Sequence, residues 1–280
     1  MQQIIPTLRL KNQLISLQHP ILMGILNITP DSFYEGSRIN THSNKSILEK
    51  AAQMLEEGAT ILDIGGYSTR PNAEDITIEE EINRVISPIR LIKKEFPHTI
   101  ISIDTFRSEV AIRAVEAGAD IINDVSGGNL DKKMFETVAH LKVPYILMHM
   151  KGTPQTMKTL THYENISTEI KTYFQDRITT LNSLGVEEII LDLGFGFAKT
   201  IDQNYFLLKN LALFAHLELP LLVGISRKSM IYKRLDIPVS ETLNGTTVLN
   251  VVAIQNGAKI LRVHDVKAAR EAIQLLEYLK

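Results

Sequence analysis

Polar side chains follow the apolar runs of this chain where each run ends. These residues are Asn27, Asp63, Asp104, Asn123, Asp124, His149, Asp192, Arg227, Lys228, Arg262 and His264. Among them, Asp104, Asn123 and Asp192 supply hydrogen-bond acceptors, and Asn123 also donates. Such a set suits a flat heterocycle that carries amino and ring N–H groups.

A second group of residues is suited to phosphate. Arg70, Arg262 and His264 offer charged or ring N–H donors, and the planar fork of arginine matches phosphate oxygens. The carbonyl oxygen of Asn27 could hold Mg²⁺, an ion that keeps most of its waters and is commonly shared with a diphosphate. The two groups together predict a ligand that is polar over most of its surface.

A local pattern that recurs four times indicates which elements carry these residues. A helical segment stops at Gly58, Gly118, Gly185 and Gly257, and a short apolar run ending in a polar residue follows each time. Glycine tolerates the left-handed backbone needed just past a helix end. Each occurrence therefore predicts a helix followed by a strand.

Eight apolar runs suggest the fold. They cover residues 21–26, 60–64, 100–103, 119–122, 144–148, 188–191, 220–225 and 259–263. Such nearly continuous, β-branched runs are typical of parallel strands buried on both faces. Strict alternation with helices favours an α/β (β/α)8 TIM barrel over an open sheet, which counting alone leaves possible. Its active site would then lie at the carboxyl ends of the strands.

The domain organisation follows from the absence of a linker. No low-complexity tract or charge run marks a second domain, so residues 1–280 are predicted to form a single domain. Residues 4–17 are predicted to form a short N-terminal β-hairpin that caps the barrel floor.

Composition excludes several classes of protein. The 30 basic and 32 acidic residues give a net charge of −2, and no basic stripe points to nucleic acid. There are no cysteines, which excludes disulfides and thiolate nucleophiles. No segment reaches the roughly 20 apolar residues of a membrane helix, and the start is not a secretory signal, so the expected location is cytoplasmic. Nothing in the sequence indicates an exposed apolar face for a partner.

Seven motifs, in order along the chain, carry a resemblance to a known family. They are ILMGILNITPDSF (21–33), ILDIGGYSTRP (61–71), ISIDT (101–105), INDVSGG (122–128), DLGFGFAK (192–199), GISRKS (224–229) and RVHD (262–265). They resemble the signatures of dihydropteroate synthases, the pterin-binding TIM barrels that join a pterin to 4-aminobenzoate. NITPDSF paired with GGYSTRP is highly specific for this family.

The resemblance implies three groups of contacts. The pterin pocket would comprise Asp104, Asn123, Met148, Asp192 and Lys228. The diphosphate site would comprise Asn27, Arg70, Arg262 and His264, with Mg²⁺ on Asn27. The surroundings of 4-aminobenzoate would comprise Phe33, Thr69, Pro71, Phe197, Lys228 and Ser229. Asp104, Lys228, Arg70, Arg262 and His264 would be the catalytic set.

The resemblance also implies an assembly and an inhibitor class. Members are commonly homodimers, and sulfonamides occupy their 4-aminobenzoate position. One departure is visible in the first loop, where the family usually follows DSF with Ser-Asp-Gly-Gly and this chain has Tyr34-Glu35-Gly36-Ser37. The closure geometry of that loop is therefore less constrained by the resemblance than the pterin pocket.

Other functions fit the residues less well. A pterin-binding methyltransferase module would use the same Asp/Asn set but needs no diphosphate clamp. A zinc hydrolase would require histidines at short spacing, and these are scattered. A Schiff-base aldolase could use Lys228, whose pKa Arg227 would depress, but leaves the acceptor cluster unexplained. A binding protein or inactive relative would not need the complete charged rim.

Overall fold

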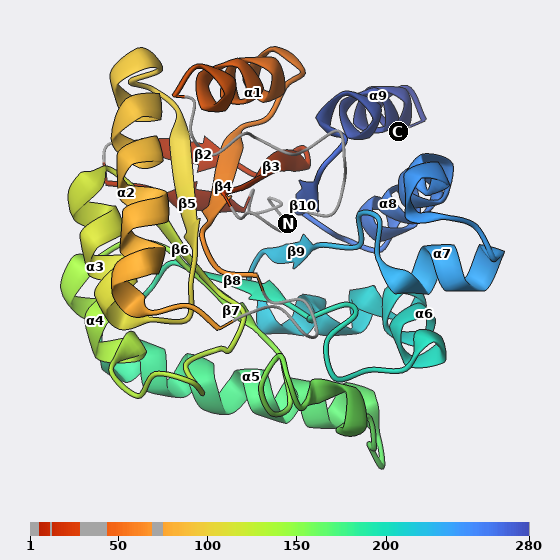
Figure 1. The fold of residues 1–280 in the computed structure, drawn as a ribbon. Helices are drawn as coiled ribbons and strands as arrows, with labels where there is room; N and C mark the ends of the chain where they lie inside the picture. Colours follow the sequence, from red (N-terminus) through yellow and green to blue (C-terminus); the bar gives the residue numbers. More distant parts are fainter. Residues whose placement is uncertain (1–5, 12, 29–43, 69–74, 280) are drawn as a thin grey trace.

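The protein folds into a closed barrel of parallel strands surrounded by helices (Figure 1). The computed structural model describes residues 6–11, 13–28, 44–68 and 75–279. The barrel strands are β3 (Ile21–Asn27), β4 (Ile61–Gly65), β5 (Ile100–Asp104), β6 (Ile121–Asp124), β7 (Tyr145–Met148), β8 (Ile189–Asp192), β9 (Leu221–Val223) and β10 (Ile260–Val263). Parallel pairing of β10 with both β3 and β9 closes the sheet. The predicted TIM barrel is confirmed, and the open sheet is excluded.

Helices follow the strands along the chain and cover the outside of the barrel. They are α1 (Asn44–Glu56), α2 (Ile78–Glu95), α3 (Ser108–Ala117), α4 (Met134–Leu141), α5 (Ile166–Ser183), α6 (Ile201–Lys209), α7 (Ser229–Leu235), α8 (Leu243–Gln255) and α9 (Val266–Glu277). In the described part of the chain, the 3₁₀ segments Met157–Thr159, Leu211–Leu217 and Val239–Glu241 lie in the connections. The described helices include none with the length and apolar character required to cross a bilayer.

The predicted helix stops have the expected backbone. Gly58, Gly118, Gly185 and Gly257 have φ angles of 105°, 120°, 83° and 99°. A side chain is strongly disfavoured in this region of backbone conformation, so glycine lets the chain turn directly from each helix into the next strand.

The N-terminal hairpin forms the floor of the barrel. Strands β1 (Thr7–Arg9) and β2 (Leu14–Ser16) pair antiparallel within the predicted segment. Leu8, Leu10 and Leu17 of this segment are buried in one cluster with barrel residues such as Met23 and Ile61. These barrel residues lie near the amino ends of their strands, so the hairpin closes the end opposite to the predicted active site, as expected.

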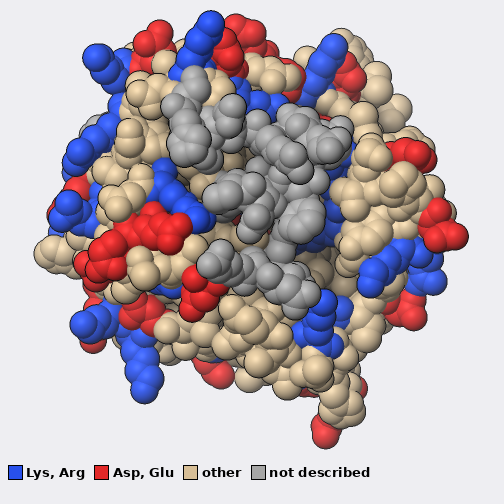
Figure 2. Space-filling view, in the orientation of Figure 1, with Lys and Arg blue, Asp and Glu red and all other residues tan. Residues whose placement is uncertain are grey.

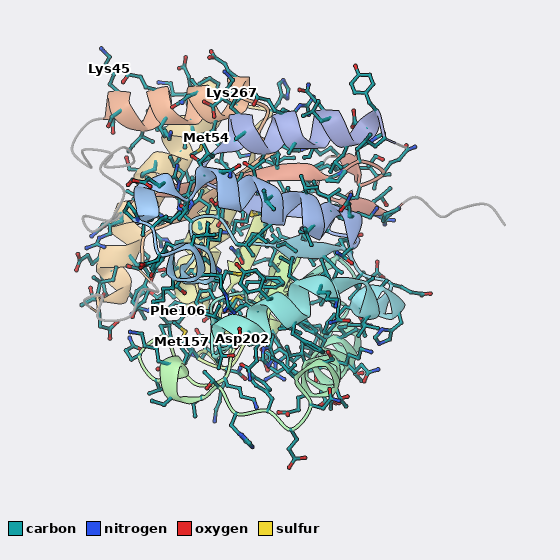
Figure 3. All side chains as sticks on the ribbon, turned by 90° about the vertical axis from the view of Figure 1, so that its right-hand side faces the viewer. Lys45, Met54, Phe106, Met157, Asp202 and Lys267 are labelled. Carbon is teal, nitrogen blue, oxygen red and sulfur yellow. The ribbon has the colours of Figure 1, made fainter. Side chains whose placement is uncertain are left out.

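The main core lies between barrel and helices. Apolar residues at helical spacing, such as Val85, Ile89 and Ile92 of α2, are completely buried against the outer faces of the strands. Side chains fill the layers around the strands (Figure 3). This packing leaves the inward-facing residues at the carboxyl ends of the strands free to form a site.

Candidate active site

Strand register aligns three predicted positions, Asn27, Asp104 and Asn123, with Gly65 across neighbouring strands. Asn27 of β3 pairs with Gly65 of β4, Gly65 with Asp104 of β5, and Asp104 with Asn123 of β6. A Cβ on Gly65 would lie 3.6 Å from Asn27 Oδ1 and 3.5 Å from Asp104 Cβ. The missing side chain thus leaves a slot at the barrel mouth between the Asn27 amide and the Asp104 carboxylate.

Arg262 of β10 is bound by two carboxylates inside this mouth. Its Nε lies 2.6 Å from Asp63 Oδ2, and its Nη2 lies 2.6 Å from Asp104 Oδ2. Asp63 is completely buried and also accepts a hydrogen bond from Asn123 Nδ2 at 3.2 Å. The sequence analysis placed Arg262 with the diphosphate group and Asp104 with the pterin; the structure joins the two residues directly.

Two carboxylates share this single guanidinium group, and this affects the pKa of Asp104. Burial raises the pKa of Asp104 to about 7; Arg262 lowers it, and the nearby charge of Asp63 raises it further. Burial alone would lower the pKa of Arg262, but Asp63 and Asp104 raise it above its ordinary value. Arg262 therefore stays charged, and Asp104 can change charge near neutral pH.

The opposite side of the mouth contains a second charged pair. Burial raises the pKa of Asp192, and Lys228 partly opposes this rise. Burial lowers the pKa of Lys228 to about 8, with Asp192 opposing. Lys228 Nζ donates to the Phe195 carbonyl and lies 4.7 Å from the centre of the Phe197 ring. An anion, a cation and an aromatic face thus meet at one place.

An apolar cluster borders these polar groups. Met148 and Met157 are buried with Val125, Met150 and Ala198, and Phe106 and Phe197 pack against them. Phe106 and Met157 lie close together at the same end of the molecule in Figure 3. Met148 pairs with Asp192 in the sheet, so an apolar surface lies directly beside that acceptor. This combination suits a flat ring with a polar edge.

Comparison with known proteins identifies the family. The sequence pattern described as "Pterin binding enzyme" matches residues 23–264. Dihydropteroate synthase from Escherichia coli K12 is 43% identical over 266 residues, which cover 94% of this chain and 93% of the relative. The chain belongs to the dihydropteroate synthase family. It is an enzyme of folate biosynthesis, and this match favours the synthase over the methyltransferase alternative.

Solved structures of dihydropteroate synthases share the fold. That of Yersinia pestis, in a sulfonamide drug complex, superposes with a TM-score of 0.93 at 38% identity and covers 98% of this chain and 99% of its own. That of Xanthomonas albilineans, with 4-aminobenzoic acid, gives a TM-score of 0.89 at 35% identity, with 98% of each chain covered.

Ser226 holds the last predicted phosphate ligand. His264 follows β10, and its Nδ1 lies 3.0 Å from Ser226 Oγ, which also accepts the His264 backbone N–H at 3.2 Å. Ser226 is buried. The sequence analysis did not select Ser226, although its place two residues before Lys228 in the synthase motif GISRKS was a usable signal.

Three rim residues, Asp124, Arg227 and His149, received no role from the resemblance, and each contacts other residues of the protein. Asp124 accepts the backbone N–H groups of Ser126 and Gly128 at 2.7 and 2.9 Å, and also the Tyr145 hydroxyl at 2.7 Å. Arg227 forms a two-bond ion pair with Asp265, at 2.9 and 2.7 Å. The Nδ1 atom of His149 lies 3.1 Å from Nζ of the buried Lys199.

The expected effect of Arg227 on Lys228 is not found. The cation that lowers the pKa of Lys228 is Arg262, which acts in addition to burial. The guanidinium of Arg227 is instead engaged by the carboxylate of Asp265. Adjacency in sequence did not place the two charges together in space.

Asp63 is the main functional candidate that sequence reasoning missed. It appeared among the rim residues but was given no role, although it lies two residues before Gly65 and so faces the same side of β4. The structure shows that it contacts both Arg262 and Asn123.

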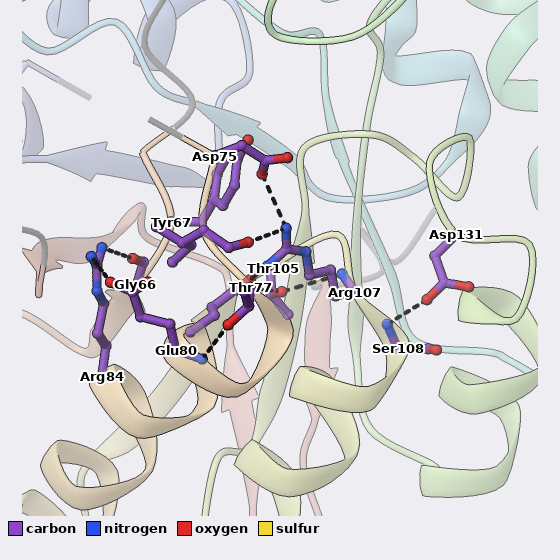
Figure 4. Close-up of polar contacts among 12 residues, drawn as sticks. Gly66, Tyr67, Asp75, Thr77, Glu80, Arg84, Thr105, Arg107, Ser108 and Asp131 are labelled. Atoms are coloured by element: carbon purple, nitrogen blue, oxygen red, sulfur yellow. Dashed lines mark hydrogen bonds and ion pairs between the residues drawn. The ribbon is translucent and has the colours of Figure 1, made fainter. Parts of the chain in front are cut away.

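Four predicted synthase residues, Phe33, Thr69, Arg70 and Pro71, lie outside the described residues, as does the segment 34–37. The described residues that flank 69–74 are held by Arg107 (Figure 4). Its Nη2 donates to the Ile76 carbonyl at 2.7 Å, its Nη1 lies 3.0 Å from Glu81 Oε2, and its guanidinium stacks over the Tyr67 ring at 5.1 Å.

The charge around the mouth is mixed. Lysine and arginine side chains alternate with acidic ones around the visible face, and neither sign covers that face alone (Figure 2). Within the described residues, no three His, Asp or Glu side chains cluster to hold a metal ion. Asn27 Oδ1, beside the Gly65 slot, offers one oxygen, which fits an ion shared with a substrate phosphate and water.

Proposed function

We propose that the chain condenses 6-hydroxymethyl-7,8-dihydropterin pyrophosphate with 4-aminobenzoate to give 7,8-dihydropteroate and pyrophosphate. One observation carries this proposal: the acceptors Asp104, Asn123 and Asp192 line the same mouth as the cations Arg262 and Lys228. The 4-aminobenzoic acid bound to the Xanthomonas albilineans relative supports the second substrate.

The pterin would bind where the acceptors meet the apolar cluster. Asp104, Asn123 and Asp192 would receive or exchange hydrogen bonds with its amino and ring N–H groups, and Met148 would pack on its face. Lys228 would donate to a ring acceptor. Buried polar groups of this kind reject analogues that leave them unpaired, by roughly 10⁴-fold.

The diphosphate would bind beside the pterin, at the Gly65 slot. Asn27, Arg262 and His264 would contact it, together with Arg70. Arg262 could exchange one of its two carboxylate partners for a phosphate oxygen. When bound, Mg²⁺ would neutralise negative charge on the departing diphosphate, and Asn27 would be its ligand from the protein.

The 4-aminobenzoate would bind near the loop after β8. Phe197, Lys228 and Ser229 would contact it, with Phe33, Thr69 and Pro71 completing its surroundings. The ammonium group of Lys228 would lie between the two substrates; its contact with the Phe195 carbonyl, its distance of 4.7 Å from the centre of the Phe197 ring and the effect of Asp192 on its pKa support this position.

The reaction breaks the bond between the pterin methylene carbon and the diphosphate oxygen. The aniline nitrogen forms a bond to that carbon and loses one proton, while the electron pair of the broken bond leaves with pyrophosphate. An SN1-like course places positive charge on the pterin. Asp192 and Asp104 would stabilise that charge, and Arg262 and His264 the charge of the leaving group. The aniline is already a nucleophile, so positioning is the main requirement.

The test is an assay for dihydropteroate with the pterin diphosphate, 4-aminobenzoate and Mg²⁺, each omitted in turn. Product is expected only with both substrates. Asp104→Asn should reduce kcat/KM about 100-fold. The exposed Asp202→Asn on α6 serves as the control and should leave kcat/KM unchanged. Absence of product from the wild-type chain would refute the proposal, and normal kinetics of Asp104→Asn would remove that residue from the site.

An exposed apolar face supports a homodimer. Leu235, Val239, Leu243 and Val248, on α7, α8 and the segment between them, are 55%, 39%, 41% and 54% exposed. The 13 residues of α8 include no charged side chain, although a helix outside a barrel normally has a polar face. This face was not expected from the sequence.

We infer that a second copy of the chain covers this face, since an apolar surface is complementary to itself. Val248→Lys should convert a dimer to a monomer in sedimentation experiments. Leu184→Lys, at the end of α5 and 40% exposed, serves as the control and should leave the dimer intact. A wild-type monomer at micromolar concentration would contradict the inference.

A further inference from the structure

A buried lysine that the proposed site does not use belongs to the loop after β8, residues 193–200. Lys199 is 8% exposed. Its Nζ lies 3.1 Å from the Gly194 carbonyl, 3.1 Å from the Phe197 carbonyl and 3.1 Å from His149 Nδ1, with the His149 carbonyl at 3.4 Å. None of these four partners is a carboxylate.

A buried ammonium group without an adjacent carboxylate is unfavourable unless its protons are used. Burial lowers the pKa of Lys199 to about 7, although Asp192 opposes the change. The ammonium form has three protons, and three acceptors lie at 3.1 Å from Nζ. One side chain therefore ties two carbonyls of the loop to the end of β7, where His149 lies.

Lys228 binds the same loop from the other side. It donates to the Phe195 carbonyl, whereas Lys199 binds the carbonyls of Gly194 and Phe197. Each lysine thus binds different backbone carbonyls of this loop, Gly194 and Phe197 for Lys199 and Phe195 for Lys228. The backbone shape that permits this requires glycine at 194 and 196, where the φ angles are +69° and +83°.

Neither glycine could be replaced without disturbing a lysine contact. A Cβ on Gly194 would overlap the His149 carbonyl oxygen and lie 3.3 Å from Lys199 Nζ. A Cβ on Gly196 would lie 3.1 Å from Lys228 Cδ. The loop therefore passes between two lysines with no room for a side chain on either side.

We propose that Lys199 is a positioning residue, which holds the Gly194 and Phe197 carbonyls so that the Phe195 carbonyl and the Phe197 ring meet Lys228. It acts through Lys228 and Phe197 and touches neither substrate. The inference rests on the proposed function only where it assigns Lys228 and Phe197 to substrate contacts. The arrangement of the loop itself is independent of that assignment.

Tyr163 gives the loop a second, weaker support. Its hydroxyl donates to the Ala198 carbonyl at 2.9 Å. Ala198 has a φ of +48°, a conformation that a residue with a Cβ seldom adopts, so this hydrogen bond helps to hold a strained position. Removing the hydroxyl should loosen the loop without leaving a cavity in the core.

The experiment compares Lys199→Met with Lys93→Met. Lys93 is a partly buried lysine that donates to Asp120 and the Thr99 carbonyl, near the amino end of β5. The first readout is the rate at which Lys228 reacts with trinitrobenzenesulfonate, followed by peptide mass spectrometry, which needs no substrate. The second is the KM for 4-aminobenzoate against kcat.

Lys199→Met should make Lys228 react several-fold faster, because the Phe195 carbonyl no longer faces it. KM for 4-aminobenzoate should rise about tenfold, with a smaller change in kcat. Lys93→Met should lower the melting temperature while leaving both readouts at the wild-type value. If Lys199→Met lowers the melting temperature and changes neither readout, Lys199 is only structural and the proposal is overturned.

Tyr163→Phe keeps the test decisive if Lys199→Met does not fold. It should change both readouts in the same direction by about threefold, because one hydrogen bond is lost. Unchanged labelling of Lys228 in Tyr163→Phe would then overturn the proposal. A wild-type chain that forms no dihydropteroate contradicts the proposed function alone, because the labelling result is independent of turnover.

Discussion

Arg262 and Asp63 lie 199 residues apart in sequence, yet their Nε and Oδ2 atoms are 2.6 Å apart inside the barrel mouth. Because the same guanidinium also binds Asp104, the acceptors predicted for the pterin and a cation predicted for the diphosphate form one unit. Charge on one part of this unit therefore affects the other, and five predictions follow from this and from neighbouring contacts.

Asp63→Asn should lower both stability and activity. Removing one carboxylate from a buried ion pair costs about 3 kcal/mol. We expect a loss of up to that size in the free energy of unfolding from urea titration, since Arg262 keeps Asp104 as a partner. We also expect a fall in kcat/KM of at least about tenfold, because Arg262 and Asn123 both lose their carboxylate contact with Asp63. The control is Asp120→Asn. Asp120 precedes β6 and contacts Lys93 and the Ile101 N–H near the amino end of β5, away from the mouth, so its loss should reduce stability only. Equal kinetics of the two variants would refute the role of Asp63.

Activity should depend on the ionisation of Asp104, whose pKa is about 7 in the free protein. Since the protonated acid cannot accept hydrogen bonds at both oxygens, kcat/KM for the pterin diphosphate should rise with pH through about 7. The acid limb should disappear in Asp104→Asn. A wild-type profile that is flat from pH 6 to 8 would contradict the assignment.

The same pKa has an opposite effect on stability. In the unfolded chain an aspartate has a pKa of about 3.9. Between that value and about 7 the unfolded chain loses a proton that folded Asp104 retains, so this residue stabilises the fold fully only below about pH 4. Its contribution falls as pH rises and is lost above about 7. The free energy of unfolding of Asp104→Asn, measured over this range, should lack this decline.

Ser226→Ala should impair the diphosphate site selectively. Ser226 holds the imidazole of His264, so its loss should raise KM for the pterin diphosphate about fivefold and leave KM for 4-aminobenzoate unchanged. Calorimetry with the pterin lacking the diphosphate provides the control, and its affinity should be normal. Equal weakening of both pterins would place His264 away from the diphosphate.

Glu81→Gln should destabilise the connection between α2 and the end of β5. Glu81 is completely buried and accepts from the Thr105 hydroxyl at 2.7 Å and from Arg107 at 3.0 Å. Without its charge, the free energy of unfolding should fall by about 3 kcal/mol. Its neighbour Glu80, which pairs with Arg84 on the exposed side of α2, provides the matched control. Glu80→Gln should change stability by less than about 0.5 kcal/mol.

Much of the fold could be predicted from local pattern. The eight apolar runs match the barrel strands within a few residues, and the four glycine stops have the predicted backbone. These features depend on residues close in sequence: the period of apolar side chains, and the conformations that glycine alone adopts easily. The same pattern predicted that polar residues at the ends of the runs would share one end of the barrel.

Local pattern could not distinguish which polar residues face inward. Asn123 and Asp124 are adjacent, but Asn123 contacts Asp63 in the mouth whereas Asp124 binds backbone N–H groups and Tyr145. The adjacent residues Arg227 and Lys228 likewise have different surroundings. Arg227 pairs with Asp265, whereas the pKa of Lys228 is affected by Asp192. Within a strand such as β6, a shift of one residue in register reverses such assignments, and register is set by neighbouring strands. After β9 the partners from other elements decide, such as Asp265 for Arg227.

The sequence by itself thus determined the barrel, the family motifs and the residue types at the mouth, because these depend on short-range patterns. Only the tertiary structure decided that Arg262 binds Asp63 and Asp104, and that Lys199 and Lys228 hold one loop from two sides. Both arrangements arise when the sheet closes β10 onto β3 and brings distant loops together. The energies of these buried charges depend on their partners across the barrel, which no local sequence pattern specifies.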